Sequence, residues 1–223
     1  MKLSLRHEII PFGIMVILLI LSIYFYPGLP ETVPSHFNMH GAPDCYSPKL
    51  QFMTIFWGIC IGLYLMLTFI PLIDPFWKKI ESRYGTLLLL RDFAMLFMVF
   101  IFVVSIIGAK WGTLPVQVMN IGFGFLFIFL GNWLPKLPRN FFFGIRTPWT
   151  LASEEVWKKS HILGGWLFVA GGILLIILAI IGISPMVSLI SILSPIVLIS
   201  AIIYPLFLYR KLQKENRLEG PEL

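Results

Sequence analysis

Charged residues are scarce in this chain of 223 residues: Asp, Glu, Lys and Arg make up 13% of the sequence, whereas hydrophobic residues make up 58%. The mean hydropathy is +0.88. A soluble domain of this length could not bury so much apolar surface, because a single hydrophobic core stops growing as the chain lengthens. This composition excludes an ordinary soluble enzyme and favours an integral membrane protein.

Cysteine pairs and catalytic motifs are missing from the sequence. The two cysteines, Cys45 and Cys60, cannot build a disulfide framework, and they do not form a CxxC pair. The sequence also lacks GxSxG, HExxH and the glycine-rich phosphate loop, the patterns that place a nucleophile, a metal ion or a phosphate group. We therefore expect a protein without enzymatic activity, without a cofactor and without a bound metal ion.

Six apolar segments are long enough to cross a membrane, which takes about 20 residues of helix. They are Ile9–Tyr26, Phe52–Ile73, Leu87–Ala109, Leu114–Leu134, Gly164–Ile183 and Pro185–Tyr209. The predicted fold class is all-α: a polytopic membrane protein with a bundle of six transmembrane helices. The first segment is followed by no small-residue cleavage signature, so we expect it to remain as a span and not to be removed as a signal peptide.

The 17 Lys and Arg residues are distributed unevenly between the loops. All except Lys49 and Lys110 fall in the N-terminal segment, in the second and fourth loops, or in the C-terminal tail, with Arg91 counted at the edge of the second loop. Because basic loops are retained in the cytoplasm, both termini are predicted to be cytoplasmic. We expect a multi-pass protein of the cell (plasma) membrane whose basic residues contact membrane lipid, with no direct binding of nucleic acid.

Small residues and prolines mark positions of helix packing. Gly58 and Gly62 form a GxxxG pattern and Gly171–Gly172 offers a second small-residue surface, which indicates either ordinary helix packing or dimerisation. Pro195 and Pro205 predict a kink in the last span, which neighbouring helices must accommodate.

The loop Leu29–Lys49 joins the first two spans and is predicted to be external. Its four prolines prevent a continuous helix, and Asn38, Gly41 and Asp44 are typical of turns. We expect this loop to form an ordered cap on the outer face.

A metal site in this loop is an alternative interpretation. His36, His40, Asp44 and Cys45 are ligand types that suit zinc, which would indicate a metal-dependent membrane enzyme. The prolines and Gly41 argue against a helix that would hold both imidazoles on one face. Hydrogen bonding and turn capping are the other interpretation of these side chains.

The loop Gly131–Trp166 is predicted to be cytoplasmic. Its first half mixes basic and aromatic side chains, which suit the lipid headgroup layer. Its second half predicts a short interfacial helix, capped by Thr150 or Ser153, with Glu154 and Glu155 near its N-terminus. Two interpretations stay open: an interfacial helix without a ligand, and a docking surface for a cytoplasmic protein.

Both loops resemble parts of a known family. The segment LPETVPSHFNMHGAPDCYSPK resembles the N-terminal domain of unknown function, DUF1648, that many members of the SdpI/YfhL family of bacterial immunity proteins carry. The segment GNWLPKLPRNFFFGIRTPWTLASEEVWKKSH is similar to the most characteristic stretch of that family. The resemblance implies a two-span unit over residues 1–73 and a four-span region over residues 74–223, with a motif loop at residues 131–166.

The resemblance also implies a function in immunity and signal transduction. The protein that gives the family its name protects its cell against a secreted peptide toxin, and when toxin-bound it sequesters an ArsR-type DNA-binding repressor at the membrane. The implied residues of the external loop, which would meet a toxin, are His36, Asn38, Gly41 and Asp44. The implied residues of the motif loop, which would hold a repressor, are Asn132, Asn140, Gly144, Arg146, Thr147, Pro148, Trp149 and Thr150.

The alternative function is a small-molecule or lipid transporter, or a permease-like accessory protein. It requires a continuous polar cavity between helices, for which Gln117, Asn120, Arg91 and Asp92 are the available side chains. Arg91 and Asp92 fall at the start of the third span, where they are either interfacial charges or a buried pair with a functional role.

Overall fold

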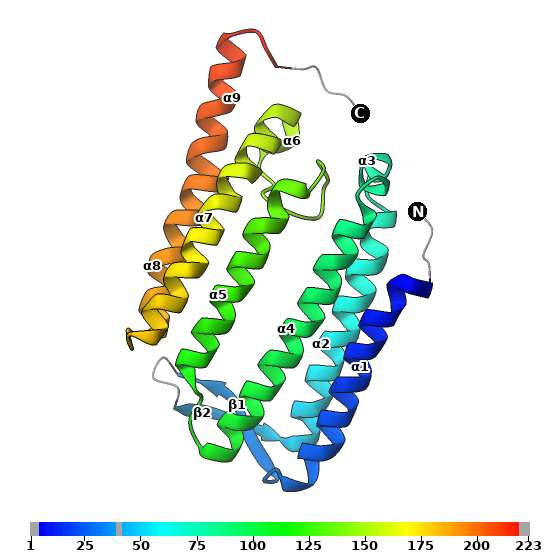
Figure 1. Ribbon diagram of the computed structural model, residues 1–223, viewed down its shortest axis with the longest axis vertical. Helices are drawn as coiled ribbons and strands as arrows, with labels where there is room; N and C mark the ends of the chain where they lie inside the picture. The colour runs from blue at the N-terminus through cyan, green and yellow to red at the C-terminus, as the bar shows by residue number, and fades with distance from the viewer. Residues whose placement is uncertain (1–4, 39–41, 219–223) are drawn as a thin grey trace. The chain divides into compact units, whose positions relative to one another are not determined.

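The computed structural model describes residues 5–38 and 42–218, and six of its helical segments are long and apolar enough to cross a membrane (Figure 1). The helices are α1 (Leu5–Phe25), α2 (Lys49–Phe69), α3 (Trp77–Glu81), α4 (Tyr84–Trp111), α5 (Val116–Trp133), α6 (Pro148–Ala152), α7 (Glu154–Ile180), α8 (Pro185–Val197) and α9 (Tyr204–Lys214). Short segments of other helix types are η1 (Tyr26–Gly28), η2 (Ile70–Leu72), η3 (Leu134–Lys136) and η4 (Leu198–Ile203). The predicted fold class is confirmed, and the protein is a multi-pass membrane protein.

The chain divides into two compact units, each built from two separate stretches of sequence. Residues 2–68 and 87–122 form the first, called here the hairpin unit, and residues 69–86 and 123–223 form the second, called the loop unit. The predicted division of the sequence at residue 73 is a different kind of boundary and stays a prediction.

The hairpin unit has a core contributed by α1, α2 and α4. Leu18, Cys60, Met95 and Phe102 are among its buried side chains, and Cys60 is fully buried. The other faces of these helices expose large apolar side chains, such as Ile20 on α1. Exposed apolar faces are expected where the solvent is lipid.

The loop between α1 and α2 forms a β-hairpin, which the sequence did not predict. Strand β1 (Thr32–Phe37) pairs antiparallel with β2 (Pro43–Pro48) at the end of α1 and α2 (Figure 1). Val33 of β1 is fully buried in the core of the hairpin unit, so the hairpin is anchored to the helices. Strand pairing is thus the regular structure of the described part of this loop, and its place as a cap on the outer face stays a prediction.

In the loop unit, α5 and α7 approach until their backbones touch. A Cβ atom built on Gly131 would lie 2.5 Å from the carbonyl oxygen of Gly165, and a Cβ atom on Gly172 would lie 2.5 Å from that of Gly124. The two contacts are spaced seven residues apart on each helix, which is two helical turns. The packing interpretation of Gly171–Gly172 is thereby confirmed.

The α2 glycines differ, because Cβ atoms built on Gly58 and Gly62 would meet nothing within 4 Å in the described part of the chain. Whether this exposed GxxxG serves dimerisation stays open.

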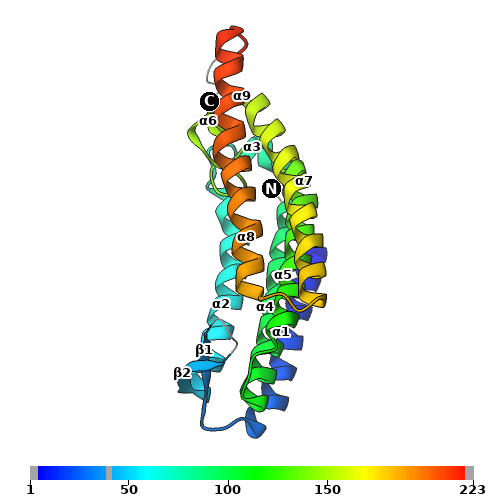
Figure 2. The ribbon, with the colours of Figure 1, turned by 90° about the vertical axis from the view of Figure 1, so that its left-hand side faces the viewer.

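The last span changes its winding between its two prolines. Helix α8 contains Pro195, the π-helix η4 follows, and α9 begins one residue before Pro205 (Figure 2). Because Pro205 has no N–H, the chain adjusts its hydrogen bonds, and the Tyr204 N–H donates to the Ile199 carbonyl, five residues earlier. The predicted kink stays a prediction, and the π-helix between the two prolines is a feature that the sequence did not predict.

The start of the fifth span differs from its prediction. We expected the second half of the motif loop to form a short interfacial helix, capped by Thr150 or Ser153 and separate from a span beginning at Gly164, but α7 begins at Glu154 and continues to Ile180. No proline or glycine lies between Glu154 and Leu163, so the helix has no reason to end before Gly164. The short helix of the loop is instead α6.

We predict that Gly172→Ala destabilises the protein, because the added methyl group must separate two backbones that already touch. The expected loss in the free energy of unfolding is about 1–3 kcal/mol, measured by thermal or denaturant unfolding of purified protein in micelles. Gly58→Ala is the matched control, since its methyl group enters open space. Equal effects of the two substitutions would contradict the backbone contact.

Candidate functional site

The motif loop, residues 131–166, is the candidate site, and it folds around its own side chains. Asn140 is fully buried, and its Oδ1 accepts hydrogen bonds from the N–H groups of Phe142 (2.9 Å) and Phe143 (2.6 Å). Its Nδ2 donates to the carbonyl of Pro138 (2.9 Å). One side chain therefore replaces the regular backbone hydrogen bonds that the loop lacks.

Gly144 closes the same loop against α7. Its φ angle is +93°, a conformation that favours glycine, and a Cβ atom there would collide with Nε2 of His161. The next residue, Ile145, donates its N–H to that Nε2 (3.0 Å).

His161 is held as a neutral ring by the groups around it. Because Nε2 accepts from a backbone N–H, it carries no proton, so Nδ1 carries the proton and donates to the Trp157 carbonyl (2.8 Å). The imidazole also stacks on the Trp157 indole, with ring centroids 4.1 Å apart. Both side chains are buried and have a structural role.

Two capped helix starts lie in the second half of the motif loop. Thr147 and Thr150 form a capping box for α6, in which the Thr147 N–H donates to Thr150 Oγ1 (2.8 Å) and the Thr150 N–H to Thr147 Oγ1 (3.3 Å). Ser153 then caps α7 by accepting from the Val156 N–H. The predicted cap at Ser153 is confirmed, whereas Thr150 is the inner partner of the box and Thr147 is the cap.

A carboxylate outside the motif loop fixes its tip. Asp74 is buried, and its two oxygens accept from the N–H groups of Phe76 (2.7 Å) and Phe141 (2.8 Å). The rings of Phe76 and Phe141 stack with centroids 5.1 Å apart. The Arg139 guanidinium lies over the Phe76 ring, 5.0 Å from its centroid.

An ion-pair cluster lies beside this stack. Glu154 Oε2 is 3.0 Å from Lys79 Nζ and 3.3 Å from Arg139 Nε. Arg139 also donates to the Leu151 carbonyl (3.3 Å). Asp74, Arg139 and His161 were not among the residues predicted for the site, because most of their partners are distant in the chain. The local signal was the four-residue spacing of Trp157 and His161.

The remaining predicted residues of the motif loop do not converge on one point. Asn132 is exposed and bonds back to its own helix at Ile128. Arg146 is exposed and donates to the Phe141 carbonyl (2.6 Å). Pro148 opens α6, and Trp149 packs toward α9 in a cluster around Leu212.

In the hairpin, His36 Nδ1 and Asp44 Oδ1 form an exposed pair 2.6 Å apart. Asn38 Oδ1 accepts from the Ala42 N–H (3.1 Å). Gly41 and His40 lie outside the described residues. Within residues 5–38 and 42–218, no group of three or more His, Cys, Asp or Glu side chains could hold a metal ion.

Arg91 lies in the hairpin unit and is fully buried within the protein, whereas Asp92 is partly buried; their depth in the membrane and a functional role stay predictions. It donates to Glu8 (3.1 Å), Asp92 (2.9 Å), Thr68 (3.1 Å) and the His7 carbonyl (2.6 Å). A network with this many partners clamps α1, α2 and α4 together. Of the other candidate cavity residues, Asn120 is buried and Gln117 is exposed.

Comparison with known proteins supports the resemblance seen in the sequence. Residues 136–209 match the SdpI/YfhL protein family, and residues 13–62 match a domain of unknown function, DUF1648. The chain is 28% identical over 177 residues to the immunity protein SdpI of Bacillus subtilis (strain 168), which covers 78% of this chain and 82% of that protein. No solved structure matches the chain.

We predict that Gly144→Ala destabilises the loop unit by about 2–4 kcal/mol, the sum of a left-handed backbone cost and a clash with His161. Thermal unfolding of purified protein measures the loss. Gly182→Ala is the matched control, because Gly182 also has a positive φ angle but open space around it. The clash is disproved if Gly144→Ala costs no more than Gly182→Ala.

Proposed function

We propose, from the similarity of the chain to SdpI and the SdpI/YfhL family, that it is a membrane immunity protein that protects its cell against a secreted peptide toxin. The observation that carries the proposal is the match to an immunity protein over most of both chains. The buried groups of the motif loop support a non-enzymatic role, because Asn140 and His161 are engaged in holding the loop together.

The proposed orientation follows from the order of the spans. Three spans, α2, α4 and α5, separate the hairpin from the motif loop along the chain, so the two emerge on opposite faces of the membrane. If the basic loops are retained inside, the hairpin faces the environment, and the motif loop and both termini face the cytoplasm. The proposed location is the plasma membrane.

The hairpin is the proposed contact for the toxin. His36 and Asp44 point away from the core and form a pair whose side chains are 70% and 45% exposed. Together with Asn38 and Gly41 they are the residues implied by the family motif. An exposed histidine and carboxylate can form charge-assisted hydrogen bonds with a peptide.

The motif loop is the proposed contact for a cytoplasmic partner, such as an ArsR-type repressor. Phe141, Arg146 and Pro148 are exposed, whereas Asn140 and Thr150 are buried. The exposed side chains form the candidate surface, and the buried ones keep its shape. A basic and aromatic surface suits an interface.

Labelling of Cys45 tests the orientation. Cys45 is exposed and Cys60 is fully buried, so a thiol reagent that cannot cross membranes reports on one site. We expect labelling of intact cells at Cys45 and its loss in Cys45→Ser. Labelling that requires broken cells, with normal labelling of the unfolded protein, would place the hairpin inside.

Survival under toxin challenge tests the function. The chain is expressed in Bacillus subtilis cells that lack SdpI, and the cells are exposed to the peptide against which SdpI gives immunity. We expect the wild-type chain to protect the cells. For His36→Ala/Asp44→Ala, we expect the number of surviving cells to fall about tenfold, because lost charge-assisted hydrogen bonds cost about 1.5–3 kcal/mol.

The matched control for this experiment is Glu31→Gln/Lys49→Gln, which removes the other ion pair of the hairpin. Protein levels in the membrane are measured for every variant. Equal killing of cells with and without the wild-type chain would remove toxin immunity as its function. If the control variant lowers survival as much as His36→Ala/Asp44→Ala does, His36 and Asp44 are not the specific contact for the toxin.

A further inference from the structure

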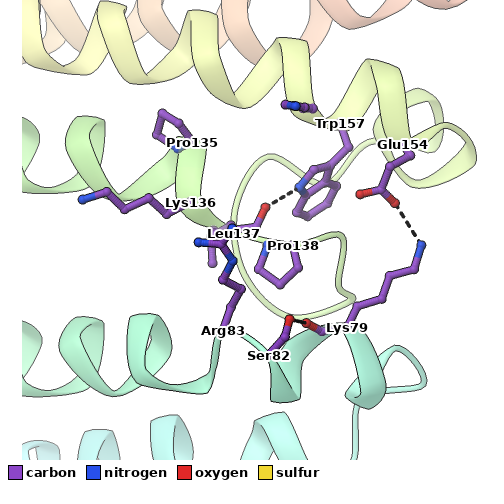
Figure 3. A pocket seen from close by; sticks show the side chains of 10 residues that line it. Lys79, Ser82, Arg83, Pro135, Lys136, Leu137, Pro138, Glu154 and Trp157 are labelled. Atoms are coloured by element: carbon purple, nitrogen blue, oxygen red, sulfur yellow. Dashed lines mark hydrogen bonds and ion pairs between the residues drawn. The ribbon is translucent and has the colours of Figure 1, made fainter.

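A pocket of about 400 Å³ opens beside the motif loop (Figure 3). Its walls come from three segments of the loop unit, within residues 79–83, 135–138 and 154–158. The Trp157 indole N–H donates to the Leu137 carbonyl (3.0 Å), which ties two of these walls together. The pocket is therefore formed in advance of any ligand.

The lining is strongly basic. Four cations, Lys79, Arg83, Lys136 and Lys158, face one carboxylate, Glu154, which leaves a net charge of +3. Glu154 is already engaged, because it pairs with Lys79 (3.0 Å) and with Arg139 (3.3 Å). Within the described part of the chain, Arg83, Lys136 and Lys158 form no ion pair, so their charge is uncompensated.

These three cations lie where spans meet the membrane surface. Arg83 directly precedes α4, Lys136 ends the span that begins with α5, and Lys158 lies near the start of α7. Side chains at the ends of spans reach the level of the lipid phosphates. The retention of basic loops in the cytoplasm explains why these residues are positively charged, but it does not explain why all three line one pocket.

We propose that this pocket binds a phosphate-bearing anion. Three cations without an ion pair in the described part of the chain line one pocket, and phosphate is the anion concentrated at the level of the span ends. The phosphate can come from the headgroup of an anionic phospholipid or from a free phosphate ion, and both would use the same cations. The site is separate from the hairpin and from Arg146, so it does not depend on the proposed immunity function.

The test uses the full-length protein in phosphatidylcholine nanodiscs, with thermal unfolding as the readout, since a ligand that binds the folded state raises the unfolding midpoint. One arm replaces part of the lipid with phosphatidylglycerol, and the other adds inorganic phosphate. The pocket variant is Arg83→Gln/Lys136→Gln/Lys158→Gln. The control variant, Lys78→Gln/Lys159→Gln/Lys211→Gln, removes the same charge from side chains that do not line the pocket.

We expect stabilisation of the wild type and of the control variant, and at least a tenfold higher ligand requirement for the pocket variant. Each basic group near a lipid surface contributes roughly fivefold in affinity. A response to phosphatidylglycerol alone identifies a lipid headgroup, and a response to inorganic phosphate identifies the free ion; either supports the site.

An equal loss of response in both triple variants overturns the proposal, because it indicates diffuse surface charge. Absence of any response in the wild type also overturns it. All three lining cations are exposed, so their substitution should not disturb packing. If the triple variant unfolds in pure phosphatidylcholine, Lys136→Gln alone is compared with Lys78→Gln. The proposal is overturned if both single variants need the same ligand concentration for stabilisation.

Discussion

Polar groups inside a membrane-spanning bundle must find their partners within the protein, because lipid offers none, and this constraint accounts for two irregular features of the spans. In the π-helix before Pro205, the Tyr204 N–H stays bonded by donating to the Ile199 carbonyl, next to a residue that has no N–H of its own. Arg91 is surrounded by carboxylate, hydroxyl and carbonyl oxygens, so its charge is tolerated among apolar helices. In the motif loop, the Asn140 side chain likewise accepts hydrogen bonds from backbone N–H groups that belong to no helix.

The six spans were predictable from the sequence because apolar runs of this length have few other stable solutions. The hairpin was not, although turn residues were recognised, since its strands are short and rich in proline and show no clear strand pattern. The start of α7 was also missed. A change from basic to apolar residues suggested a boundary near Gly164, whereas Ser153 already provides the cap and nothing interrupts the helix after it.

The sequence identified the motif loop and many of its members, but it did not separate their roles. Asn140 and Thr150 maintain the shape of the loop from buried positions, Gly144 through its backbone conformation, and Arg146 lies on the surface. Asp74 was missed because it bonds to Phe141, 67 residues away, and no local pattern encodes that contact. Distant partners of this kind become visible only when the chain is folded.

The glycine contacts between α5 and α7 have a mechanical consequence. Side chains packed between two helices can change rotamer when one helix moves, so they absorb part of the movement. Where the two backbones touch, no side chains lie between them to do so. Helix α7 carries Glu154, Trp157 and His161 in its first turns, and Gly165 and Gly172 further along. A displacement of the motif loop is therefore transmitted through α7 to α5, and the two helices are expected to move together.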